Sequence, residues 1–164
     1  MVSFIPIFRS LEVANIRYVT VGGIATVLYG FARVTGDIDI VLDLSEGNAG
    51  AAMDVFSALG FRPRAPVPIQ DFASASKRNE WISDKGMQVF SIFSPQFKLI
   101  EIDIFVREPI PFPQLWERSV LMAIDDVPIR VVGIDDLILL KEDANRPQDI
   151  EDVRVLKSIK ASMP

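Results

Sequence analysis

Apolar and polar residues follow two rhythms along this chain, one typical of helices and one typical of strands. The helical rhythm and its breaks predict helices over residues 3–14, 24–29, 47–59, 134–144 and 148–160. Runs rich in apolar, β-branched and aromatic residues predict strands over residues 17–21, 37–42, 87–93, 99–106, 119–124 and 127–132. The last helix is expected to present one apolar face, made by Ile150, Val153, Leu156 and Ile159.

Glycines, prolines and acidic residues mark where these elements end. Gly30 and Gly60 are expected to stop two helices, and Asp135 is the candidate N-cap of a third. Prolines interrupt residues 61–80, where we expect an extended surface loop with room for a short strand or helical turn. The prolines of residues 109–113 predict a stiff linker before the last predicted hairpin.

Residues 21–41 carry the strongest candidate chemistry. A strand ends at Gly22-Gly23, and a short helix then leads to a strand that carries Asp37 and Asp39. Because side chains alternate along a strand, both carboxylates point the same way. Their mutual repulsion is relieved by a cation, and hard oxygen ligands suit Mg²⁺ or Mn²⁺. The double glycine exposes backbone N–H groups, which suit a phosphate.

A third carboxylate is expected to join this pair from a later strand. Asp103 and Glu101 share one face of the strand predicted over residues 99–106. If that strand neighbours the one that carries Asp39, about 4.8 Å away, Asp103 stands beside the pair and Glu101 is the weaker candidate. Asp43 lies ~13 Å beyond Asp39 and is left out. Three carboxylates can hold two divalent ions beside a nucleoside triphosphate.

Composition narrows the chemistry further. The 164 residues include neither cysteine nor histidine, which excludes thiolate nucleophiles, cysteine zinc sites and histidine-based catalysis. Catalysis must then rest on carboxylates, lysine, arginine, tyrosine or a metal. The net charge of −5 disfavours long nucleic acid as a partner. The length predicts a single domain over residues 1–164, with helices about 134–160 packed on it. The absence of cysteine fits a cytoplasmic protein. Without a basic leader or a long apolar run, we expect no signal peptide and no membrane span.

The order of these motifs resembles the nucleotidyltransferase superfamily, whose fold is shared with DNA polymerase β. The signature is carried by Val21-Gly22-Gly23, Asp37-Ile38-Asp39-Ile40 and Ile102-Asp103-Ile104. A longer likeness to AbiEii-type toxins and related small prokaryotic nucleotidyltransferases rests on Tyr29-Gly30, Arg33, Thr35, Asp136-Leu137-Ile138, Lys141, Asn145-Arg146-Pro147, Asp149 and Asp152. Residues 61–86 carry no part of it. The resemblance implies an α+β fold, a small mixed β-sheet with helices packed mainly on one face.

The resemblance also implies roles for individual residues. Asp37, Asp39 and Asp103 are expected to be catalytic metal ligands, with Mg²⁺ or Mn²⁺ as cofactor. Gly22 and Gly23 are expected to hold the triphosphate. The chain departs from the family where Gly23 stands in place of a common serine and Tyr29 in place of a frequent histidine.

Further nucleotide-binding candidates are Arg33, Thr35 and Lys141, and simpler structural roles stay open for each of them. Arg33 suits phosphate but can equally pair with an acid, and Thr35 can cap its loop. Lys141 fits a phosphate contact or a proton acceptor. With Arg146, Asp149 and Asp152 it can equally form salt bridges on solvated helix faces.

Two classes of function stay open. The first is a metal-dependent nucleotidyltransferase that moves a nucleoside monophosphate from an NTP to an acceptor and releases pyrophosphate. The acceptor stays open among a small molecule, a protein and a tRNA end, as does the oligomeric state. The second is a catalytically silent nucleotidyltransferase-like module that binds or regulates a partner. Membership of a toxin–antitoxin or phage-defence pair is compatible with both.

Overall fold

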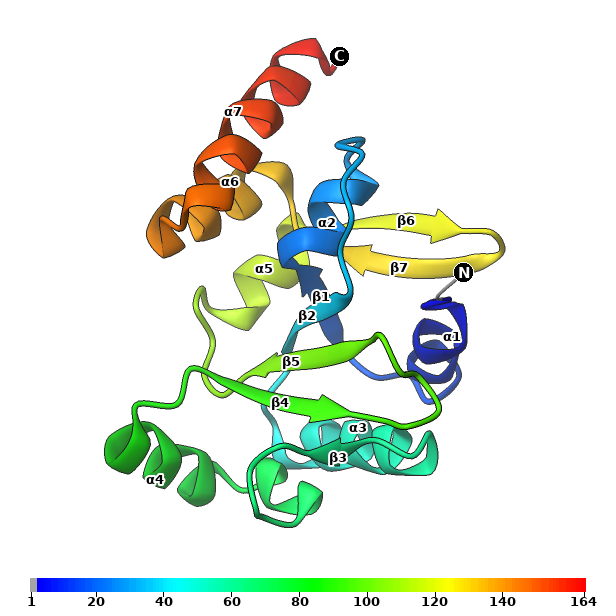
Figure 1. Cartoon of the computed structure of the whole chain (residues 1–164), viewed down its shortest axis with the longest axis vertical. Helices are drawn as coiled ribbons and strands as arrows, with labels where there is room; N and C mark the ends of the chain where they lie inside the picture. The colour runs from blue at the N-terminus through cyan, green and yellow to red at the C-terminus, as the bar shows by residue number, and fades with distance from the viewer. Residues whose placement is uncertain (1–2) are drawn as a thin grey trace.

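The computed structural model describes residues 3–164, which form a seven-stranded mixed sheet flanked by helices (Figure 1). The strand order is β3-β4-β5-β2-β1-β7-β6. The strands are β1 (Tyr18–Val21), β2 (Asp37–Leu42), β3 (Arg62–Pro63), β4 (Val89–Phe93), β5 (Glu101–Phe105), β6 (Val120–Ile124) and β7 (Val127–Val131). The helices are α1 (Ile5–Val13), α2 (Gly22–Leu28), α3 (Glu46–Ala58), α4 (Ala75–Lys85), α5 (Phe112–Arg118), α6 (Ile134–Ala144) and α7 (Pro147–Ser162), with a 3-10 helix η1 at Ile69–Ala73.

Strand β2 lies at the centre of this sheet and places its apolar and acidic side chains on opposite faces. It pairs antiparallel with β1 and parallel with β5. Ile38 and Ile40 of β2, with Ile102 and Ile104 of β5, are at most 1% exposed and belong to the main core. Since side chains alternate, the acidic residues between them face the opposite side of the sheet.

Most predicted elements are confirmed with boundaries shifted by a few residues. The mixed α+β architecture is confirmed, as is the terminal hairpin β6–β7, whose turn places Asp125 at a positive φ of 52°. Gly30 and Gly60 both have positive φ and end their helices as expected. No helix within residues 3–164 has the length and apolar character needed to cross a membrane.

The prediction of an extended loop over residues 61–80 is wrong for most of that segment. It forms β3, η1 and the first half of α4, which the Ser74 side chain caps by accepting a hydrogen bond from the Lys77 backbone. Helix α4 is mostly polar but buries Arg78 and Trp81, and Trp81 stacks on Phe90 at 5.2 Å between ring centroids. Tertiary burial, more than local periodicity, stabilises this helix.

Three smaller predictions are also wrong. The N-cap of α6 is Gly133, and Asp135 lies in the first turn. The expected stiff linker ends early because α5 begins at Phe112, where a proline in the first helical turn is well tolerated. The apolar face predicted for α7 fails at Ile150, which is 61% exposed, whereas Leu156 is buried as expected and Asp149 and Asp152 are buried as well.

Burial of Phe72 predicts that the segment before α4 belongs to the core. Phe72 is 0% exposed and packs on Phe90 at 5.3 Å. We expect Phe72→Ala to lower the free energy of unfolding by about 3–5 kcal/mol. Urea denaturation should show this loss, and Leu99→Ala, at a side chain that is 71% exposed, should cost far less. Equal losses in the two variants would contradict the packing described.

Candidate active site

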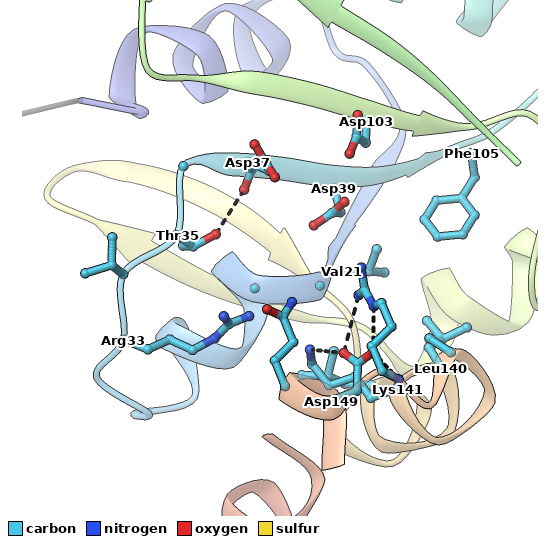
Figure 2. Close-up of a pocket in the computed structure, with 18 residues that line it drawn as sticks. Val21, Arg33, Thr35, Asp37, Asp39, Asp103, Phe105, Leu140, Lys141 and Asp149 are labelled. Carbon is cyan, nitrogen blue, oxygen red and sulfur yellow. Dashed lines mark hydrogen bonds and ion pairs between the residues drawn. The ribbon is translucent and has the colours of Figure 1, made fainter. Parts of the chain in front are cut away.

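A cavity of about 310 Å³ opens beside the Gly22–Gly23 turn. All eight site residues expected from the sequence line it: Gly22, Gly23, Arg33, Thr35, Asp37, Asp39, Asp103 and Lys141. Figure 2 shows the three aspartates together on the strand side, with Lys141 and Asp149 on the facing helices. Residues far apart in the sequence therefore meet in one pocket.

The aspartates come together through the parallel pairing of β2 with β5. In this register Asp39 lies opposite Asp103, and Asp37 lies opposite Glu101. The Ser91 hydroxyl of β4 donates a hydrogen bond of 2.6 Å to Asp103 and orients it. Glu101 instead accepts hydrogen bonds from Arg64 at 2.8 to 3.0 Å. The structure thus brings Asp103 to the pair and leaves Glu101 engaged elsewhere.

Asp43 lies outside this pocket, as expected. Its carboxylate accepts a hydrogen bond of 2.7 Å from Arg17 and another of 3.0 Å from the Ser45 backbone. These contacts give Asp43 a structural role at the end of β2.

The glycine turn is shaped by the side chains that lie over it. Gly22 has a φ of +67°, and a Cβ there would collide with the Asp39 carboxylate. A Cβ on Gly23 would lie 2.8 Å from both the Arg33 guanidinium and the Thr35 hydroxyl. The space that a serine would use at residue 23 is therefore taken by two other polar side chains.

Burial and mutual repulsion perturb the acidic cluster. The pKa of Asp39 is raised from 3.8 to about 6, first by burial and then by the charges of Asp103 and Asp37, with a partial offset from Arg146 and the Gly23 backbone. Burial also raises the pKa of Asp103, and the hydrogen bond from Ser91 opposes that rise. Asp39 and Asp103 are therefore costly to ionise without a nearby cation.

This donor set fits a divalent cation in its chemistry. The three carboxylates line one pocket, and none of them forms an ion pair within residues 3–164. Over the same described range, no three acidic side chains lie close enough together to hold a metal ion in their present positions. Hard oxygen ligands that repel one another are nevertheless what Mg²⁺ or Mn²⁺ stabilises, so these residues could hold such an ion.

A buried ion network forms the other wall. Lys141, 4% exposed, donates to Asp152 at 2.7 Å and to Asp149 at 3.3 Å. Arg33 pairs with Asp152 at 3.2 Å, and Arg146 pairs with Asp149 at 2.7 Å. Burial acts to raise the pKa of Asp149, but hydrogen bonds from Arg146 and the charge of Lys141 lower it overall.

The network holds one more positive than negative charge, because three cations share two carboxylates. The expectation of salt bridges is met, but Lys141 and the two carboxylates are buried beside the pocket, and only Arg146, 64% exposed, faces solvent as expected. The sequence did not single out Ser91 or Phe105 as neighbours of the site. Only the strand pairing brings Ser91 to Asp103.

Solved structures show what this architecture is similar to. A lincosamide antibiotic adenylyltransferase, LnuA, bound to lincomycin, is 16% identical, with a TM-score of 0.63 over 94% of each chain. ANT(2″)-Ia in complex with adenylyl-2″-tobramycin is 16% identical, with a TM-score of 0.56 over 94% of this chain and 89% of that one. An antigenic nucleotidyltransferase-like protein from Paracoccidioides brasiliensis is 16% identical, with a TM-score of 0.57 over 94% of this chain and 72% of that one.

These likenesses establish that the chain has the nucleotidyltransferase fold. No protein-family model and no curated sequence matches it. The finer resemblance to AbiEii-type toxins stays a prediction.

The raised pKa of Asp39 predicts a pH-dependent stability in metal-free protein. Below about pH 4 the folded and unfolded states both hold the proton. Between about pH 4 and 6 only the folded state keeps it, so the free energy of unfolding falls as pH rises. The difference between 3.8 and about 6 corresponds to about 3 kcal/mol.

Asp39→Asn removes this titration. We expect the free energy of unfolding of the variant, relative to that of wild type, to increase by up to about 3 kcal/mol as the pH rises from 4 to about 7.5. Urea denaturation with a chelator present measures the gain. A difference between the two proteins that stays constant across this pH range would contradict the burial of Asp39 beside Asp103.

The close approach of Gly22 to Asp39 predicts a large effect of Gly22→Ala. Gly86 offers a matched control, because its φ is +60° and nothing lies within 4 Å of an added Cβ. Gly86→Ala should cost only the backbone strain, about 1–2 kcal/mol. Gly22→Ala should cost clearly more in denaturant unfolding, since it also displaces the Asp39 carboxylate. Equal losses would show that Asp39 does not lie over Gly22.

Proposed function

We propose that this protein is a metal-dependent nucleotidyltransferase that moves a nucleoside monophosphate from an NTP to an acceptor hydroxyl or phosphate and releases pyrophosphate. The observation that carries the proposal is the juxtaposition of Asp37, Asp39 and Asp103 with the Gly22–Gly23 turn in one pocket. The nucleotidyltransferase fold of the chain supports it. The absence of cysteine agrees with a cytoplasmic protein.

One part of the pocket would bind the triphosphate and the other the metal ion. The backbone N–H groups of Gly22 and Gly23, with Arg33 and Lys141, would hold the triphosphate through charge-assisted hydrogen bonds. Lys141 is bound by two carboxylates, which favours a phosphate contact over the role of proton acceptor. Thr35 lies over Gly23 and would help to fix the turn.

The three aspartates would bind Mg²⁺ or Mn²⁺. When bound, the ion supplies charge neutralisation for the phosphates and activation of the attacking oxygen. The pairing of Asp39 with Asp103 and the hydrogen bond from Ser91 hold two of these ligands in place before substrate arrives. Such preorganisation is the main contribution a protein makes to phosphoryl-type transfer.

The solved structures that resemble this chain suggest which class of acceptor to test first. LnuA binds lincomycin and ANT(2″)-Ia carries an adenylylated tobramycin, so small molecules with free hydroxyls are the first acceptors to test. A protein side chain and a tRNA end are the next two.

Isosteric loss of one carboxylate should separate catalysis from folding. We expect Asp39→Asn and Asp103→Asn each to lower nucleotidyl transfer at least about 100-fold, because each removes charge that would hold the metal and its phosphates. Transfer is measured as pyrophosphate release from each NTP with Mg²⁺ and a panel of the three acceptor classes. Circular dichroism checks that the fold persists.

Asp43→Asn is the matched control, since Asp43 directly follows the same strand but lies outside the pocket. It should keep transfer and Mg²⁺-dependent NTP binding close to wild type. Calorimetry that finds no NTP binding by the wild-type protein, with or without Mg²⁺, would reject the enzyme and favour a catalytically silent binding module.

A further inference from the structure

The two edges of the sheet differ in how well they are protected from pairing with another strand. At one edge, β3 has only two residues, Arg62 and Pro63, and its short length, its charge and its proline all discourage further pairing. At the other edge, β6 has five residues and contains no charge, proline or glycine. Its pairing with β7 runs without a bulge, and Figure 1 shows it on the outer side of the hairpin. Strand β6 therefore lacks the features that protect β3.

The backbone of β6 offers free hydrogen-bonding groups along this edge. Directly after β7, Val132 donates to the Thr20 carbonyl of β1 at 3.0 Å, so the odd-numbered residues of β7 turn their backbone toward β6. Those residues pair with Val120, Met122 and Ile124. The N–H and C=O groups of Leu121 and Ala123 therefore point away from β7. Within residues 3–164, no backbone group outside the hairpin bonds to them.

The side chains of this edge are apolar and exposed. Val120 is 40% exposed and Leu121 is 61% exposed, and Ala123 is exposed as well. The charged groups lie at the two ends of the strand. Arg118 precedes it with a half-exposed side chain, and the acidic turn that follows it contains Asp126, whose side chain is 73% exposed. The edge is thus apolar in the middle, basic at one end and acidic at the other.

We propose that β6 is a dimer interface, at which it pairs antiparallel with β6 of a second copy about a two-fold axis at Met122. In this register, Leu121 exchanges hydrogen bonds with Ala123 of the second copy, so the free backbone groups are satisfied and a large side chain lies beside a small one. Each acidic turn then lies at the level of Arg118 of the other copy. Parallel pairing would instead bring the two acidic turns together. Charge and shape therefore make this edge complementary to itself, as a two-fold interface requires.

The absence of cysteine from the chain makes the register testable with single introduced thiols. Met122→Cys should form an intermolecular disulfide on mild oxidation, because residues opposite each other without hydrogen bonds have Cα atoms about 4.5 Å apart. Val120→Cys is the matched control on the same strand face, since its two copies would lie roughly 14 Å apart along the strand. Non-reducing gel electrophoresis measures the cross-link. No cross-link in Met122→Cys, or equal cross-linking of the two thiols, would overturn the proposal.

Sedimentation equilibrium of the full chain should show a dimer that dissociates on dilution. Ala123→Pro removes an outward N–H group and no bond to β7, so it should weaken the dimer at least about tenfold. Leu121→Lys leaves the backbone intact, guards against a folding defect in Ala123→Pro and should weaken the dimer at least about tenfold as well.

Leu99→Lys is the matched control, because Leu99 is 71% exposed and lies outside the hairpin, and it should dimerise like wild type. A wild-type monomer at every concentration up to the solubility limit would overturn the proposal and favour an extended segment of another protein as the partner of β6. A dimer unchanged by both hairpin variants would also overturn it. Neither result depends on the outcome for nucleotidyl transfer.

Discussion

The parallel pairing of β2 with β5 is the constraint on which the candidate site depends. It places Asp39 opposite Asp103, although their carboxylates repel. The same register buries four isoleucines, each worth about 1.5–3 kcal/mol, and a slip of β5 by one residue would turn two of the four toward the pocket. Their total outweighs the about 3 kcal/mol that the raised pKa of Asp39 represents. Apolar burial therefore holds an acidic cluster that would not assemble by itself.

The chemistry-bearing residues could be predicted from sequence because each one lies in a strongly patterned element. The alternation of Asp37, Ile38, Asp39 and Ile40 fixes the face of each side chain whatever the neighbouring strand is. The glycine pair marks its own turn. What the sequence could not supply was the sheet order, because pairing between distant strands leaves no local signal. From the sequence, Asp103 joins Asp37 and Asp39 only on the condition that their strands are neighbours, and the sheet order of β2 and β5 meets that condition.

The parts that sequence reasoning missed are those in which tertiary contacts override local pattern. Helix α4 has a polar surface and depends on Trp81 packing against Phe90. Helix α7 departs from its apolar pattern at one end, since it buries Asp149 and Asp152 and exposes Ile150, although Leu156 is buried. A buried carboxylate is stable only with partners, and those partners come from α6 and from the loop before β2. Only the folded chain shows that Lys141, Arg33 and the two aspartates form one network beside the glycine turn.

The central claim is that the three aspartates and the glycine turn form one metal–nucleotide site. Crystals soaked with Mn²⁺ and a non-hydrolysable NTP test it most directly, because anomalous scattering locates the metal independently of the nucleotide. We predict a Mn²⁺ peak coordinated by Asp39 and Asp103, with the triphosphate against the Gly22–Gly23 backbone. Mn²⁺ and nucleotide bound away from these residues, or an empty pocket at saturating concentrations of both, would contradict the account.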